Sequence, residues 1–163
     1  MSFQQMKTVI ANAYNQNAEY VRMKNASGVF EGKRRIPVLS GDSGTGKTAC
    51  VEEFAKERGF ELLRIDCSFE PANFLVVHLH QALGRFRKDS SGTIILLDNI
   101  NEADEEWLSL LDQYSRNFLD ATMKLGKVDD QGEVIHPVEW TSHAVKVASI
   151  PEQIFVVGEM RPE

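Results

Sequence analysis

Apolar positions along this chain switch between two spacings, and the switch predicts helices and strands in turn. The first stretch repeats its apolar residues every three or four positions, which predicts a helix near 3–24. Ser2, with Gln5 three residues later, forms a capping-box pattern at its start. Residues 25–35 contain two glycines and a basic triplet, so we interpret them as a loop.

Four short apolar runs are typical of strands, and helical stripes separate them. The runs are 36–40, 60–66, 93–97 and 154–157. The run 93–97 (TIILL) is apolar nearly throughout, as expected for a central strand covered on both sheet faces. The first intervening helix is expected to stop at Gly59, and the second to begin near Pro71. Alternating strands and helices imply a mostly parallel sheet with helices on both faces and ligands at its carboxyl edge.

The region between the third and fourth runs has a different pattern. Apolar residues at helical spacing from Asp104 to about Lys124 predict one long amphipathic helix that closes at Gly126. Alternating apolar positions then predict a β-hairpin or a small excursion between about 127 and 149, with Pro137 favouring an edge position.

The strongest chemical signal follows the first apolar run. It matches the phosphate-binding pattern G-x-x-x-x-G-K-[ST] in full, between a predicted strand and a predicted helix. Its residues are Gly41, Asp42, Ser43, Gly44, Thr45, Gly46, Lys47 and Thr48. The glycines allow backbone N–H groups to curl around a phosphate, Lys47 can reach the β- and γ-phosphates of a nucleotide, and the Thr48 hydroxyl can hold Mg²⁺. The alternative, a glycine-rich turn that matches by chance, is disfavoured by the flanking elements.

A second oxygen ligand for Mg²⁺ is expected at the end of a neighbouring strand. Asp98 directly follows the apolar run 93–97, so it is the candidate metal ligand beside Thr48. The alternative role for a strand-terminal aspartate is to cap a turn.

These segments together resemble an AAA+ ATPase core, and more narrowly its MoxR and dynein-related (AAA_5-like) branch. The resemblance spans about 36–162 and is carried by the phosphate loop (Walker A), the Walker B stretch 97–103 (LDNINEA) and the segment 155–162 (FVVGEMRP). It implies an α/β, three-layer P-loop NTPase fold of the ASCE type, with a hairpin insertion near 127–149. It also implies ATP and Mg²⁺ as ligands, ring formation and the remodelling of protein partners.

The residue after Asp98 departs from the family pattern. Family members usually have a glutamate there to polarise the attacking water, whereas Asn99 can orient water but cannot accept its proton. ATP hydrolysis is therefore expected to be slow or to use a different proton acceptor. Glu102 is the nearest acidic substitute, although it is equally well explained as a solvated carboxylate at a helix start.

Two further departures lie at the end of the pattern. Where the family usually has asparagine in T-x-N-P, this chain has Arg161, which can either contact the γ-phosphate or form a salt bridge to Glu159. The chain ends after this strand, so we expect a core without the helical lid, sensor 2 or downstream arginine finger. Nucleotide affinity and the coupling of nucleotide state to a neighbouring subunit are then expected to be weaker. The basic triplet 33–35 can supply a cation to an adjacent subunit, although a solvated surface patch is the favoured interpretation.

Composition narrows the choice of partner. The 163 residues suggest one domain, with 1–35 as an N-terminal helix and loop and 36–163 as the core. A net charge of −6 disfavours nucleic acid as a partner, leaving protein partners, either in a homo-oligomeric ring or on a complete AAA+ ring. Two cysteines without CxxC spacing, and no membrane-length apolar run, favour a cytoplasmic protein.

Two functional hypotheses follow. The first is an ATP-binding protein with Mg²⁺-dependent, weak ATP hydrolysis, in which Lys47, Asp98, Asn99, Glu102 and Arg161 are the candidate catalytic residues. The second is a degenerate AAA+ interaction or inhibitory subunit that binds nucleotide structurally or not at all.

Overall fold

The structure, a computed structural model, describes residues 2–27, 31–42, 44–128 and 134–161, with side chains for all of these except 126–128 and 134–140. Strands and helices alternate along most of this length. None of the described helices is both long enough and apolar enough to cross a membrane.

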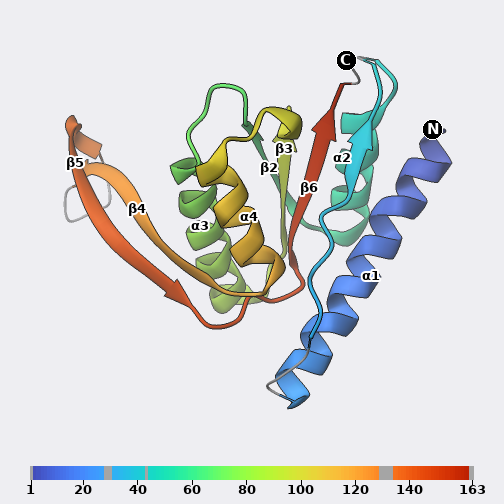
Figure 1. Cartoon of the computed structure of the whole chain (residues 1–163), viewed down its shortest axis with the longest axis horizontal. Helices are drawn as coiled ribbons and strands as arrows, with labels where there is room; N and C mark the ends of the chain where they lie inside the picture. The colour runs from blue at the N-terminus through green and yellow to red at the C-terminus, as the bar shows by residue number, and fades with distance from the viewer. Residues whose placement is uncertain (1, 28–30, 43, 129–133, 162–163) are drawn as a thin grey trace.

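Four parallel strands form the centre of the fold (Figure 1). In spatial order they are β1 (Val38–Ser40), β6 (Ile154–Met160), β3 (Thr93–Asp98) and β2 (Glu61–Asp66). All three neighbouring pairs run parallel. β3 and β6 are the interior strands and are buried along nearly their whole length, so the prediction of a central strand over 93–97 is confirmed.

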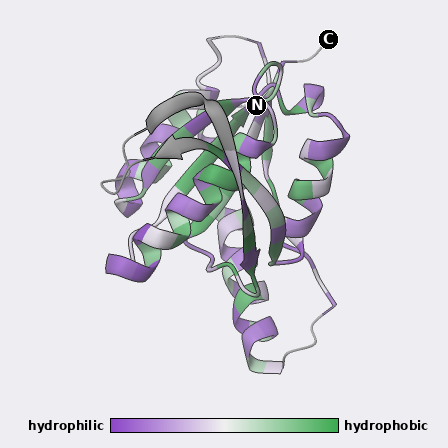
Figure 2. Ribbon diagram, turned by 90° about the vertical axis from the view of Figure 1, so that its left-hand side faces the viewer, coloured by the Kyte–Doolittle hydropathy of each residue, from purple (hydrophilic) through white to green (hydrophobic). Residues whose placement is uncertain are grey.

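Helices cover both faces of this sheet and complete the predicted three-layer α/β arrangement (Figure 1). One face packs against α1 (Phe3–Ser27) and α2 (Lys47–Arg58), and the other against α3 (Asn73–Asp89) and α4 (Glu105–Ser115). The sheet therefore separates two hydrophobic clusters. Figure 2 shows hydrophobic residues along the strands and hydrophilic residues on the outer surfaces of the helices. Burial of these apolar side chains is the main stabilising contribution to such a fold.

The helix ends follow the signals in the sequence. At the start of α1 the Gln5 amide donates to Ser2 Oγ at 3.1 Å, and the Ser2 amide donates to Gln5 Oε1 at 2.7 Å, which is the predicted capping box. α2 ends at Arg58, and Gly59 caps it with a φ of 69°, in the left-handed region that glycine adopts without strain. Asp104 caps α4 by accepting a hydrogen bond from the Trp107 amide at 3.0 Å.

The predicted long helix over 104–124 is wrong in its second half. α4 ends at Ser115, and Asn117 then adopts a left-handed backbone conformation with φ 67°. Strand β4 (Leu119–Val128) follows, and burial alternates along its start: Leu119 and Met123 are buried, whereas Asp120 is exposed. The apolar residues of this stretch match a period of two as well as a helical period, and pairing with a second strand selects the extended conformation.

The hairpin consequently begins earlier than the predicted 127–149. β4 pairs antiparallel with β5 (Val134–Val147), with Leu119 opposite Val147 at the inner end. The hairpin extends away from the central sheet on the side of α3 and α4 (Figure 1). The Asn73 side chain fixes its β4 edge, because Nδ2 donates to the Lys124 carbonyl at 3.0 Å and Oδ1 accepts from the Lys124 amide at 2.7 Å. The side chains at 134–140, whose alternation suggested the hairpin, lie outside the described residues.

Arg34 connects the loop before β1 to two distant parts of the chain. Its side chain is only 3% exposed, and its guanidinium lies 4.5 Å from the centre of the Tyr114 ring. It donates hydrogen bonds to four acceptors, which are Asn117 Oδ1 (2.8 Å), Ile150 O (2.9 Å), Pro151 O (3.2 Å) and Ile154 O (2.7 Å). One cation therefore joins the end of α4 to the connection between β5 and β6.

Neither interpretation of the basic triplet 33–35 holds for Arg34, which is neither a solvated patch residue nor free to reach another subunit. Its neighbours remain at the surface: the Lys33 ammonium lies 3.7 Å from Asp112, and the Arg35 side chain is exposed. The Arg35 carbonyl accepts a hydrogen bond from Asn17 Nδ2 at 2.9 Å, which holds the backbone of the loop against α1. Local sequence does not reveal which of three adjacent cations points inward.

We expect Arg34→Ala to lower the free energy of unfolding by about 3 kcal/mol, because it leaves buried carbonyl groups without donors. Urea denaturation would measure the change. Arg35→Ala is the matched control, since loss of an exposed side chain is expected to change stability by about 0.5 kcal/mol or less. Coincident denaturation midpoints for the two variants would contradict the role assigned to Arg34.

Candidate active site

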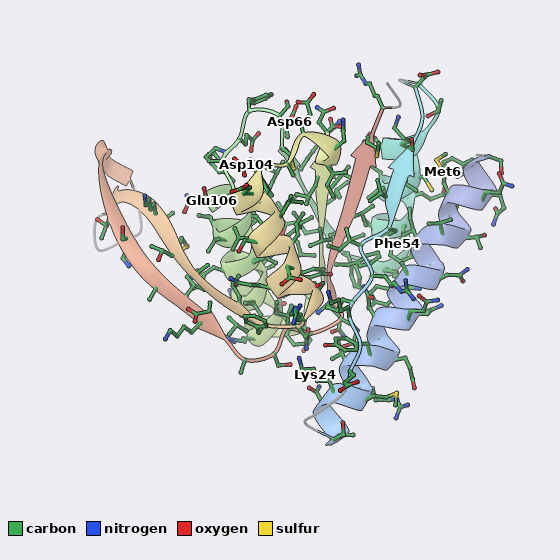
Figure 3. The ribbon with its side chains drawn as sticks, in the orientation of Figure 1. Met6, Lys24, Phe54, Asp66, Asp104 and Glu106 are labelled. Carbon is green, nitrogen blue, oxygen red and sulfur yellow. The ribbon has the colours of Figure 1, made fainter. Side chains whose placement is uncertain are left out.

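Side chains from the ends of the strands gather at the carboxyl edge of the sheet. They line a pocket of about 290 Å³, whose walls come from Asp42, residues 44–49, Arg64 on β2, Asp98 on β3, and residues 159–161 at and just after the end of β6. Figure 3 marks this edge at Asp66, the last residue of β2. In open sheets of this kind ligands bind at this edge, between the strand ends and the first turn of a helix.

The phosphate loop lies between β1 and α2, as predicted. Gly44 and Gly46 have φ angles of 82° and 88°, which side-chain-bearing residues rarely adopt. No side chain caps the start of α2, so its first N–H groups are open to an anion. The Lys47 ammonium donates to the carbonyl oxygens of Gly41 and, at 3.1 Å, Asp42. Ser43 lies outside the described residues.

The hydroxyl of Thr48 contacts a carboxylate that the sequence did not single out as a site residue. Thr48 Oγ1 lies 3.1 Å from each of the two carboxylate oxygens of Glu159, which is only 2% exposed. Burial raises the pKa of the Glu159 carboxyl, and the nearby charge of Asp98 raises it further. A signal was present, because Glu159 is an acidic residue at the end of a buried strand, as Asp98 is.

Asp98 is held by a cation from the neighbouring strand. Arg64 Nη2 lies 2.8 Å from Asp98 Oδ2, and the Asn99 amide donates to Asp98 Oδ1 at 3.0 Å. Arg64 is a second residue of the pocket that the sequence did not indicate. Strand β2 pairs parallel with β3, with Asp66 opposite Asp98. Arg64 lies two residues before Asp66 on the same face of the sheet, so its side chain can reach Asp98.

Asn99 does not line the pocket. Its backbone is left-handed, with φ 53°, and its Nδ2 donates to Asp66 Oδ1 at 3.0 Å. Partial desolvation acts to raise the pKa of the Asp66 carboxyl, but hydrogen bonds from Ser68 and Asn99 together hold that pKa below its usual value. The amide of Asn99 is therefore directed to the end of β2.

Of the two remaining candidate residues, Arg161 lines the pocket and Glu102 does not. Arg161 is exposed and lines it, and it forms no ion pair with Glu159 within the described part of the chain. Glu102 is exposed at the end of a short 3-10 helix, η1 (Ile100–Glu102), outside the pocket. The structure thus brings together the phosphate loop, Asp98 and Arg161, and leaves Asn99 and Glu102 aside.

The oxygen ligands of the pocket suit Mg²⁺. Thr48, Asp98 and Glu159 supply one hydroxyl and two carboxylates, the hard ligands that this ion prefers. The described residues contain no group of three or more His, Cys, Asp or Glu side chains arranged to hold an ion by themselves.

A sequence model of one family, described as the ATPase family associated with various cellular activities (AAA), matches residues 37–122. The chain belongs to the AAA family. Membership implies nucleotide binding and ATPase-type activity in general, and the matched region contains the phosphate loop and Asp98. No curated protein is similar enough to the chain to count as a match.

The two cysteines of this AAA protein are core residues. Burial raises the pKa of the Cys67 thiol to about 12, with the charge of Asp66 as the next cause, and burial also raises the pKa of Cys50. Both thiols are free and buried. A thiol with a raised pKa holds little of the reactive thiolate at neutral pH.

We expect iodoacetamide at pH 8 to modify neither Cys50 nor Cys67 in the folded protein, because the thiolate is scarce and the sulfur atoms are buried. Unfolding in urea restores an ordinary thiol pKa near 8.5 and should permit rapid modification of both. Mass spectrometry of the two reactions would measure the difference. Rapid labelling of Cys67 in the native protein would contradict its assigned environment.

Proposed function

We propose that this AAA protein binds ATP with Mg²⁺ in the pocket at the carboxyl edge of the sheet and hydrolyses it slowly. The observation that carries the proposal is a complete phosphate loop whose left-handed glycines lead into an uncapped helix start. The start of α2 directs N–H groups and a partial positive charge at the position of a phosphate.

Nucleotide binding requires Lys47 to change partners. Its ammonium bonds two carbonyl groups of its own loop, and a phosphate tail offers it charged acceptors that form stronger hydrogen bonds. Arg161 lines the same pocket and has no ion pair among the described residues. In this proposal it contacts the phosphates. The two cations would neutralise charge on the β- and γ-phosphates.

Mg²⁺ would be held by the Thr48 hydroxyl and the Asp98 carboxylate. When bound, this ion neutralises charge that develops on the phosphate oxygens. Arg64 lies 2.8 Å from Asp98 Oδ2 and would compete with the metal for that carboxylate. This competition is one physical reason to expect modest activity.

Slow turnover is expected for a second reason, which is the lack of a carboxylate at the position after Asp98. Asn99 can orient water but cannot take its proton, and it bonds Asp66 instead of lining the pocket. The proton would pass to Glu102 or to bulk solvent, and the exposure of Glu102 outside the pocket favours the solvent.

Partners and family branch are part of the same proposal. AAA proteins generally act on protein substrates and often oligomerise, so we propose a homo-oligomeric ring or docking on a complete AAA+ ring. The hairpin β4–β5 between α4 and β6 supports assignment to the MoxR and dynein-related branch, together with the 97–103 and 155–162 segments. Two free cysteines are typical of a reducing compartment, which supports a cytoplasmic location.

The alternative is a degenerate AAA subunit that binds nucleotide structurally or not at all and acts through protein contacts. One observation favours it: key side chains of the site already have protein partners. Lys47 is bonded to loop carbonyls, Asp98 to Arg64, and Asn99 to Asp66.

Mg-ATP is expected to raise the melting temperature by about 5 °C or more at one hundred times its dissociation constant. Lys47→Ala should abolish the shift, because it removes the ammonium that contacts the phosphates. Lys56→Ala, an exposed lysine in the last turn of α2, should leave the shift intact. Thermal denaturation of the three proteins with and without Mg-ATP tests this, and an unshifted wild type would refute ATP binding.

Asn99→Glu is expected to raise the rate of ATP hydrolysis by about tenfold or more, because repulsion by Asp66 turns the new carboxylate away from the end of β2 and leaves it as a proton acceptor next to Asp98. Asn99→Gln is the matched control, since it has similar length and the same left-handed backbone cost but no carboxylate. Phosphate release under saturating Mg-ATP measures both. A wild type that is already fast, or equal rates for the two variants, would show that the missing carboxylate does not limit turnover.

A further inference from the structure

Glu159 is a buried carboxylate without a compensating cation among the described residues. The two cations that act electrostatically on Glu159 both bond other groups: the Lys47 ammonium bonds loop carbonyls, and Arg64 pairs with Asp98. Its described partner is the neutral Thr48 hydroxyl. A buried carboxylate that lacks a cation is costly, and such groups usually pair with one or coordinate a metal.

The contact with Thr48 orients the hydroxyl. Oγ1 lies 3.1 Å from both carboxylate oxygens of Glu159, so its proton points to Glu159 and its lone pairs are left for another partner. Both side chains line the pocket beside the phosphate loop. A carboxylate that fixes a metal-binding group in this way typically tunes affinity for the ion.

The position of Glu159 is otherwise unfavourable for nucleotide binding. It shares the pocket with Asp98 and with the start of α2, where the phosphates of a nucleotide would lie. Two carboxylates and a polyphosphate repel one another unless a cation lies between them. Arg64 neutralises Asp98 at 2.8 Å, which leaves Glu159 as the carboxylate with unbalanced charge.

We propose that Glu159 is a further ligand of the Mg²⁺ site, from strand β6, and acts with Thr48 on the ion that accompanies the nucleotide. The inference rests on the proposed function, since it concerns the metal of the same nucleotide pocket. The sequence pattern predicted metal ligands only in the phosphate loop and at the end of β3, and this proposal adds one from β6. Asp98 then becomes available as a ligand to the extent that Arg64 releases it.

The proposal predicts opposite changes in two binding measurements for Glu159→Gln. Mn²⁺ should bind the ADP complex at least about tenfold more weakly, because a ligand is lost. ADP in excess EDTA should bind as tightly as to wild type or more tightly, because the repulsion between carboxylate and phosphates is removed. Electron paramagnetic resonance of Mn²⁺ and titration calorimetry of ADP measure the two quantities without reference to turnover.

Control variants separate this role from a structural one. Glu52→Gln, at an exposed position of α2 outside the pocket, should change neither measurement. Glu159→Asp retains the carboxylate one methylene shorter and should bind Mn²⁺ better than Glu159→Gln, which keeps the comparison possible if one variant folds poorly. The melting temperature of each protein without ligand checks its folding.

The results of these measurements separate the proposed role of Glu159 from the proposed nucleotide binding. Unchanged Mn²⁺ affinity in Glu159→Gln would overturn the inference while leaving nucleotide binding intact. Equal loss of Mn²⁺ and metal-free ADP binding would also overturn it, because the residue would then act by shaping the pocket. A wild type that binds neither ADP nor Mn²⁺-ADP would refute the proposed function itself.

Discussion

The insertion of β6 between β1 and β3 is the constraint on which the site depends. Parallel pairing on both edges of β6 sets the strand ends side by side: Ser40 is opposite Met160, and Leu97 is opposite Gly158. The last described strand of the chain therefore completes a pocket whose lining begins at Asp42. Glu159 reaches Thr48 because of this order, although more than one hundred residues separate them in sequence.

The same arrangement requires the connection between α4 and β6 to be held firmly, and Arg34 does so. Its hydrogen bonds reach Asn117 at the end of α4 and Ile154 at the start of β6, with Ile150 between them. Charged donors in the interior form strong bonds, and an arginine with five N–H groups can serve several carbonyls at once. The hairpin can thus leave the central sheet while the strand after it remains in register.

Charge balance in the pocket rests on pairs formed within the protein. Lys47 is bonded to carbonyl groups of its own loop, and Arg64 is paired with Asp98. Nucleotide and metal binding would exchange these internal partners for phosphate oxygens and Mg²⁺. Affinity is then a difference between two sets of contacts, which makes the internal pairs as important as the phosphate loop itself.

Local signals in the sequence predicted much of the fold and several residues of the candidate site. The capping box at Ser2, the phosphate loop and Asp98 after a buried run depend on neighbours within a few residues, so pattern alone located them. Residues 116–124 were misassigned because their apolar spacing suits a helix and a strand, and only pairing with β5 selects the strand.

The inward orientation of Arg34, the contact of Glu159 with Thr48 and the pairing of Arg64 with Asp98 were decided by tertiary structure alone. Each joins residues that are more than thirty positions apart in the chain. Burial and partner choice at such positions follow from which elements pack together, and the residue type at a single position does not contain that information.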